Sequence, residues 1–282
     1  MFHHKYDALF AWLFRIIATI SVLSLCFILF FLSRESYLFF SSGHLTEIIS
    51  DNYWHPADGD FYLLPMLIGS LLIMTGAMLI AFPLGLLLAL FCRFYAPPLL
   101  SAFIQRAIEI VAAIPAVIYG FWGVIFIVPP LAQWHAPGTS LLAGILVLIL
   151  IVLPGITIII YNSLANIDQA ILQNAISLGL GRASTIRHVV MPEIKQSLLT
   201  GATLQSGRAI GETLAVLMVC GNIVQMPGSI FDPVRTLTSN IALEMAYALD
   251  MHRSALFFSG LVLLLLVLSL SWLADSQQQL DT

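Results

Sequence analysis

Two charged residues inside an otherwise apolar segment are the first candidates for chemistry. Arg208 and Glu212 are four residues apart in the apolar run 198–219, so a helix would bring them onto one face, where they can pair. Arg208 would lie roughly 15 Å into this run, near the bilayer centre, where an arginine costs about 2.5–3.5 kcal/mol. We therefore predict that both residues face a solute path. An ion pair that only joins helices is the alternative.

The combination of an arginine with a carboxylate indicates the kind of solute. The planar guanidinium of Arg208 stays charged and matches the geometry of an oxyanion. A carboxylate beside it disfavours an anion unless that anion carries a proton. Glu212 can accept the O–H of hydrogen phosphate, whereas sulfate offers none. Gln205, Ser206 and Thr213 add polarity nearby. The pattern predicts a site for a protonated oxyanion that rejects sulfate.

The composition is that of a membrane protein. Apolar residues make up 60% of the 282 residues and charged residues only 9%, far from the balance of globular proteins. No basic run indicates nucleic acid, and the three cysteines form no metal-binding spacing. Because a helical span needs about 20 apolar residues, we predict an all-α membrane protein with about six transmembrane helices. The apolar runs cover residues 16–32, 63–91, 108–128, 141–161, 198–219 and 255–273.

The positions of lysine and arginine predict the orientation. With the N-terminus inside, the cytoplasmic segments hold Lys5, Arg15, Arg93, Arg106, Arg182, Arg187 and Lys195, and the outer segments hold Arg34, Arg235 and Arg253. We therefore predict that both termini are cytoplasmic and that the first run is an uncleaved span rather than a signal peptide. Residues 1–62 would form the first helix and an outer loop, and residues 63–282 the core. The acidic outer loop 33–62 is either solvated or a docking surface for a soluble partner.

Proline and glycine residues predict how the helices pack. In the third apolar run, Pro115 would loosen the helix, and Gly120 and Gly123 would let a neighbouring helix approach closely. Gly207 and Gly211 in the fifth run have the spacing that favours a second close approach.

A polar segment separates the fourth and fifth runs and is predicted to form two short helices. Asp168 would cap the first helix, and Ser184 would cap the second. Gly179 and Gly181 would form the elbow between them, since glycine readily adopts the left-handed conformation that ends a helix. Pro192 would begin the next helix, where its missing N–H costs nothing. The result would be a compact projection on the cytoplasmic side.

The spacing in this segment resembles the EAA loop of ABC-importer permeases. In that family the loop's short helix inserts into a groove of an ATPase subunit, so the resemblance implies that the loop 162–195 carries cytoplasmic coupling helices. The chain has no G-x-x-x-x-G-K-[ST] phosphate loop. We therefore expect that the partner ATPase binds ATP and Mg. We expect that this chain binds no cofactor. The residues that match the family pattern, with glutamine in place of its glutamate, are Gln173, Ala175, Gly179, Val189, Met191 and Pro192.

Three longer segments resemble the PstC-type permease subunits of bacterial phosphate ABC importers. They are residues 108–123, 207–222 and 229–245. The resemblance implies the type I importer permease fold, the bacterial inner membrane, no enzymatic activity in this chain, and roles in transport for Arg208 and Glu212. It also implies three kinds of partner: a PstA-type permease subunit, two ATPase subunits and a periplasmic phosphate-binding protein. Membrane lipid is a further expected partner, because the chain is predicted to span the bilayer. The alternatives are a permease for another oxyanion, such as phosphonate or molybdate, and a regulatory membrane scaffold that does not transport.

Overall fold

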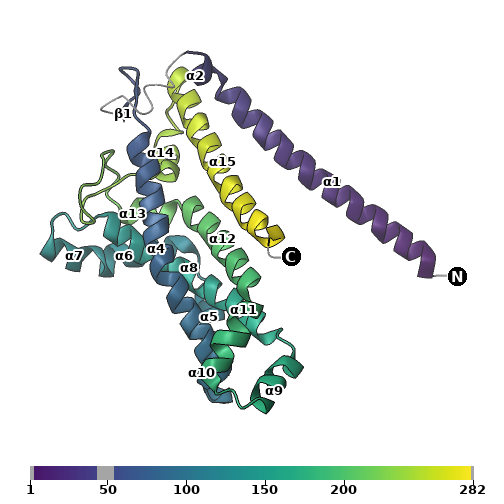
Figure 1. Ribbon diagram of the computed structural model, residues 1–282. Helices are drawn as coiled ribbons and strands as arrows, with labels where there is room; N and C mark the ends of the chain where they lie inside the picture. The colour runs from purple at the N-terminus through teal and green to yellow at the C-terminus, as the bar shows by residue number, and fades with distance from the viewer. Residues whose placement is uncertain (1–2, 43–53, 281–282) are drawn as a thin grey trace. The chain divides into compact units, whose positions relative to one another are not determined.

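The computed structural model of the chain describes residues 3–42 and 54–280, which are predominantly helical (Figure 1). The chain divides into two compact units, residues 1–62 with 244–262 and residues 63–243 with 263–282. The elements of the first unit are α1 (His3–Glu35), α2 (Tyr37–Ser41), β1 (Trp54–His55), β2 (Asp60–Phe61) and the beginning of α15 (Asp250–Leu280). The remaining elements are α4 (Leu64–Leu90), the π-helix η1 (Phe91–Tyr95), α5 (Pro98–Ala112), α6 (Ala116–Phe126), α7 (Val128–Trp134), α8 (Leu141–Ala165), α9 (Gln169–Ser177), α10 (Arg182–Thr185), the π-helix η2 (Ile186–Val190), α11 (Met191–Glu193), α12 (Lys195–Gly211), α13 (Leu214–Val219) and α14 (Leu237–Glu244).

Five helical segments in the described part of the chain are long and apolar enough to cross a membrane. Of the six predicted runs, the first, second, fourth and sixth each correspond to one of them, and the third overlaps another in part. The all-α membrane class is therefore confirmed. The five segments are Phe10–Glu35, Leu64–Tyr95, Ala116–Trp134, Leu141–Ala165 and Asp250–Trp272.

Two predicted runs are not single helices, and the prediction of one continuous helix for each was wrong. In the third run, α5 ends at Ala112 and α6 begins at Ala116. The break includes Pro115, which has no N–H to continue the helix. In the fifth run, α12 ends at Gly211 because Glu212 adopts an extended conformation, with ψ at 125°. A separate helix, α13, then completes the run.

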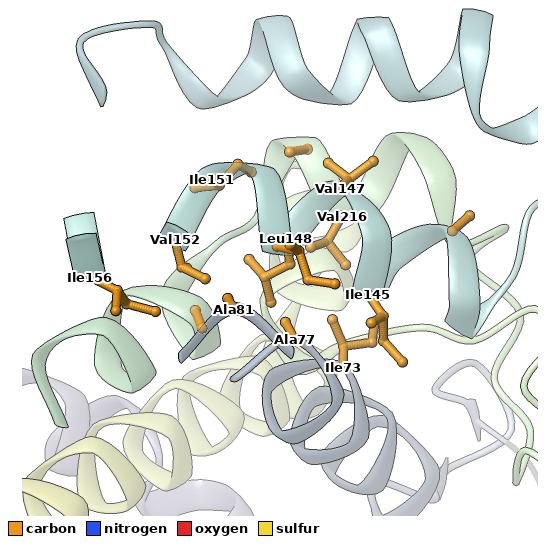
Figure 2. Packing of buried hydrophobic residues seen from close by; sticks show 14 of the residues in the cluster. Ile73, Ala77, Ala81, Ile145, Val147, Leu148, Ile151, Val152, Ile156 and Val216 are labelled. Atoms are coloured by element: carbon orange, nitrogen blue, oxygen red, sulfur yellow. The ribbon is translucent and has the colours of Figure 1, made fainter. Parts of the chain in front are cut away.

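The core of the second unit is the seam between α4 and α8. Figure 2 shows small side chains of α4, among them Ala77 and Ala81, beside larger side chains of α8, among them Leu148 and Val152. All four of these side chains are fully buried. Within a membrane, helices associate through van der Waals packing, which small residues favour because they let the backbones approach closely. This seam provides the support on which α12 and α13 pack.

The first unit is held by aromatic packing and buried hydrogen bonds. The strands β1 and β2 pair antiparallel, with Trp54 opposite Phe61. Phe39 packs edge-on against Phe61, with ring centroids 5.3 Å apart. The buried carboxylate of Glu244 accepts a hydrogen bond from Trp54 Nε1 at 2.8 Å and lies 2.8 Å from His252 Nε2. These contacts fix residues 54–61, which belong to the acidic loop 33–62, against the start of α15.

Candidate functional site

The break between α12 and α13 places Arg208 and Glu212 in different local settings. Arg208 lies in the last turn of α12, and Glu212 is the residue that ends this helix. Glu212 Oε1 accepts a hydrogen bond from the backbone N–H of Ala215 at 3.4 Å, so this carboxylate caps the start of α13. Thr238 Oγ1 donates to the Glu212 carbonyl oxygen at 3.1 Å. Two side-chain hydrogen bonds therefore support the break: one joins the Glu212 carboxylate to α13, and the other joins Thr238 to the Glu212 backbone.

Arg208 is exposed on a stripe of α12 that also contains Leu204 and Gly211. Within the described residues, close contacts between acidic and basic side chains join His252 to Glu244 and Arg253 to Glu35, and none joins Arg208 to Glu212. The predicted helical pair is therefore not formed in this structure. The roles predicted for both residues in a solute path remain predictions.

Two predicted close approaches have different outcomes. At Gly120 of α6, an added Cβ would lie 2.6 Å from Ala215 Cα, so α6 and α13 touch through their backbones, as predicted. Gly123 likewise leaves no room for a Cβ beside Val147 of α8. At Gly211, by contrast, an added Cβ would meet nothing within 4 Å, and at Gly207 it would make an ordinary contact. The Gly207–Gly211 face is therefore not a close helix contact within this chain.

Tyr119 connects α6 to the end of α5. Its hydroxyl donates to the carbonyl oxygen of Val111 at 2.7 Å, which spans the break before Pro115. Because Gly120 of α6 touches Ala215 of α13, the helix that follows the first break packs against the helix that follows the second.

A polar loop follows α13 and leads to α14. Gly221 and Asn222 both have positive φ, at 85° and 55°, and let the chain reverse. Arg235 Nε donates to the Asn222 carbonyl oxygen at 2.9 Å, and Arg235 Nη1 donates to Asn240 Oδ1 at 3.0 Å. Hydrophobic periodicity carries no signal for a hydrogen-bonded loop, so it could not predict these contacts. Their contacts fix α14, from which Thr238 reaches Glu212.

The polar loop 162–195 forms the two predicted short helices, with one correction. Asp168 Oδ1 accepts from the Ala170 backbone N–H at 2.9 Å and caps α9, as predicted. Gly179 has a φ of +77° and forms the predicted left-handed end. The predicted cap at Ser184 was wrong: α10 begins at Arg182, after Gly181 in an extended conformation. Because Gly181 already turns the chain into the helix, the Ser184 side chain lies inside it and contacts His188 instead.

The residues predicted to couple to an ATPase differ in exposure. Gln173, Gly179 and Pro192 are exposed, Val189 and Met191 are half-buried, and Ala175 is buried. On the same projection, Ile176 and Leu178 are 69% and 81% exposed. Beside it, a hollow of about 270 Å³ is lined by residues of η1, α9 and α10 and by Leu180. The guanidinium of Arg182 lies 6.0 Å from the centre of the Tyr95 ring, which ties α10 to η1.

Metal ligands are absent from this arrangement as far as the structure describes it. Residues 3–42 and 54–280 contain no group of three or more His, Cys, Asp or Glu side chains that could hold a metal ion.

The fold defines the class of protein: it is that of ABC importer permeases. A methionine ABC transporter, MetNI, in an inward-facing conformation matches with a TM-score of 0.63 and 17% identity, over 78% of this chain and 96% of that chain. A bacterial alginate ABC transporter, solved in complex with an alginate pentasaccharide-bound periplasmic protein, matches with a TM-score of 0.64 and 14% identity, over 95% of each chain.

Sequence similarity identifies the family within that class. Residues 81–280 match the family described as binding-protein-dependent transport system inner membrane component, and the chain belongs to this family. It is 38% identical over 226 residues to the probable ABC transporter permease protein YqgH of Bacillus subtilis, which covers 78% of this chain and 73% of that protein. It is 32% identical over 297 residues to the phosphate transport system permease protein PstC of Pasteurella multocida, over 95% of this chain and 91% of that protein. The resemblance to PstC-type permeases is confirmed.

Proposed function

We propose that this chain is the transmembrane permease subunit of an ATP-driven phosphate importer. The similarity to PstC proteins supports phosphate as the solute; besides the Pasteurella multocida protein, the PstC of Haemophilus influenzae is 31% identical over 88% of this chain. The fold supports the permease role. In this proposal the chain forms the translocation path with a second permease subunit of PstA type.

The observation that carries the proposal is the exposure of Arg208 on the stripe it shares with Leu204 and Gly211. An arginine that faced lipid near the middle of a bilayer would cost about 2.5–3.5 kcal/mol or more. Buried or water-lined surroundings remove that cost, and intramembrane ionisable groups usually line a solute path. A second permease subunit opposite this stripe would enclose such a path. The arginine would then attract the anion, and Glu212 would accept its O–H.

The proposal assigns the cytoplasmic projection to coupling. Ile176 and Leu178 are too apolar and too exposed for a solvated loop, which supports their burial against a partner. We assign this surface to the ATPase subunits, which would bind ATP and Mg. A periplasmic phosphate-binding protein would deliver the anion from the other side. The positions of Lys and Arg support cytoplasmic termini.

Uptake of radiolabelled phosphate by cells that lack other phosphate importers tests the proposal. The complete transporter with Arg208→Gln should import no phosphate while its subunits still assemble, because glutamine keeps the polarity but removes the charge that attracts the anion. Arg106→Gln is the matched control, since Arg106 is also an exposed arginine but lies on α5. Phosphate uptake by the Arg208→Gln transporter at the wild-type rate would refute the role of Arg208. Import of phosphonate or molybdate in place of phosphate would assign another solute.

A further inference from the structure

We propose that Gln205 is a further ligand of the transported anion, placed one helical turn before Arg208 and accepting a hydrogen bond from the anion's O–H group. The inference rests on the proposed function and adds a residue to its site. It starts from a buried polar group. Gln205 is only 8% exposed, yet its Oε1 atom has no hydrogen-bond partner within the described part of the chain. A buried acceptor without a partner is costly, and native proteins keep few of them.

The side-chain amide of Gln205 occupies a space beside Gly155 of α8, here called its seat, which any side chain at position 155 would fill. A Cβ built on Gly155 of α8 would lie 2.7 Å from Gln205 Nε2, 2.8 Å from its Oε1 and 2.9 Å from its Cδ. The amide therefore packs directly against the backbone of α8, just after Pro154. This contact restricts the conformations of the Gln205 amide. Its Oε1 atom, which has no hydrogen-bond partner within the described residues and is called the orphan oxygen below, is therefore held in a defined position. An apolar side chain would fill the same seam between α8 and α12 without leaving an orphan group.

Gln205 and Arg208 lie on neighbouring faces of α12. At about 100° and 1.5 Å per residue, Gln205 and Arg208 are about 60° apart around the helix and about 4.5 Å apart along it. The buried line of Gly201, Gln205 and Ala209 thus borders the exposed stripe that contains Arg208. An anion held by the guanidinium would have the Gln205 amide within one turn, toward the cytoplasmic end of the helix.

A neutral amide suits this position chemically. Its oxygen accepts the O–H of a singly or doubly protonated phosphate, and its NH₂ group donates to a phosphate oxygen. Unlike Glu212, it adds no negative charge, so it attracts a protonated oxyanion without repelling the charge that Arg208 attracts. Fully ionised sulfate could not satisfy the orphan oxygen, and the site would discriminate against it for that reason.

Three substitutions in the complete transporter, reconstituted in proteoliposomes with its binding protein, test the inference. Gln205→Leu removes the amide but fills the seam. Gly155→Ala keeps the amide and forces it out of its seat, at low cost in stability because the displaced atoms are the end of a flexible side chain. Gly201→Ala is the matched control, since its added Cβ would also meet α8, 3.1 Å from Ile159 Cγ2, where there is no polar group. Phosphate uptake, ATP hydrolysis and thermal stability are measured for each.

Gln205→Leu and Gly155→Ala should each lower the maximal rate of phosphate uptake about tenfold, the effect of one lost hydrogen bond to a charged ligand. ATP hydrolysis and thermal stability should stay at the level of Gly201→Ala. The double variant should import no more slowly than Gln205→Leu, because Gly155 acts only through the amide. Wild-type uptake in Gln205→Leu would overturn the inference and leave Gln205 as a packing residue. A wild-type transporter that imports a different oxyanion would refute the proposed function, while slower import of that oxyanion in Gln205→Leu would still support Gln205 as a ligand.

Discussion

The contact between α6 and α13 provides a sharp test of how closely this permease is packed. In Gly120→Ala, the new Cβ would lie 2.6 Å from Ala215 Cα, whereas ordinary contacts begin at 3.4 Å. The backbone of α13 must therefore move by about 0.8 Å, since the obstructing atom cannot rotate away. Overpacking of this kind costs about 1–3 kcal/mol, and the gain in helix propensity from replacing glycine returns at most about 1 kcal/mol. We expect Gly120→Ala to be less stable, by about 1–3 kcal/mol, than a helical glycine-to-alanine substitution that causes no clash.

The thermal stability of the purified protein in detergent measures this loss, and Gly211→Ala is the control. An added Cβ at Gly211 meets nothing within 4 Å, so the propensity gain should act alone and leave stability unchanged or slightly higher. The displacement of α13 should also lower phosphate uptake in Gly120→Ala, because the Glu212 carboxylate caps the start of α13. A Gly120→Ala protein as stable as Gly211→Ala would show that α6 and α13 do not touch through their backbones.

Three further predictions concern other parts of the chain. Gly179→Val should leave the rate of ATP hydrolysis unchanged but abolish its coupling to phosphate uptake, because a β-branched residue strongly disfavours a φ of +77°. Gly181→Val is the control that should transport normally, because Gly181 has a φ of −71°. Trp54→Phe should destabilise the protein by about 1–3 kcal/mol in a thermal unfolding assay, because the buried Glu244 carboxylate loses the hydrogen bond from the indole N–H. An unchanged melting temperature would contradict that hydrogen bond. In the orientation that we propose, a cysteine replacing Asp58 should react with an impermeant thiol reagent added to intact cells, and one replacing Ala183 only after lysis; labelling of both in intact cells would contradict this orientation.

Local sequence signals predicted the parts of the fold that depend on local physics. Long apolar runs must be helical in lipid, and the helices that carry the first, second, fourth and sixth runs follow from that requirement alone. The cap at Asp168 and the left-handed turn at Gly179 were also predictable, because each depends on one residue's own chemistry. The motif spacing in the cytoplasmic loop and near Arg208 was enough to indicate the family.

Apolar periodicity could not locate the two breaks in the helices, because α12 and α13 read as one continuous pattern. The break at Glu212 depends on hydrogen bonds from Ala215 and from Thr238, and Thr238 is 26 residues away. Such contacts exist only once α14 has packed. The same is true of Gln205, whose polarity is visible in the sequence while its seat on Gly155 is not.

The sequence by itself determined that the chain is helical and membrane-embedded, because hydrophobicity is a property of single residues and their spacing. It also predicted that Arg208 and Glu212 meet a solute, because charged residues are rare within apolar runs. Only the tertiary structure decided which of those residues are exposed, capped or left without a partner. Arg208 emerged on an exposed stripe and Glu212 at a helix end because the contacts of α12 with α4 and α8, and of α13 with α6, fix the rotation and the length of each helix.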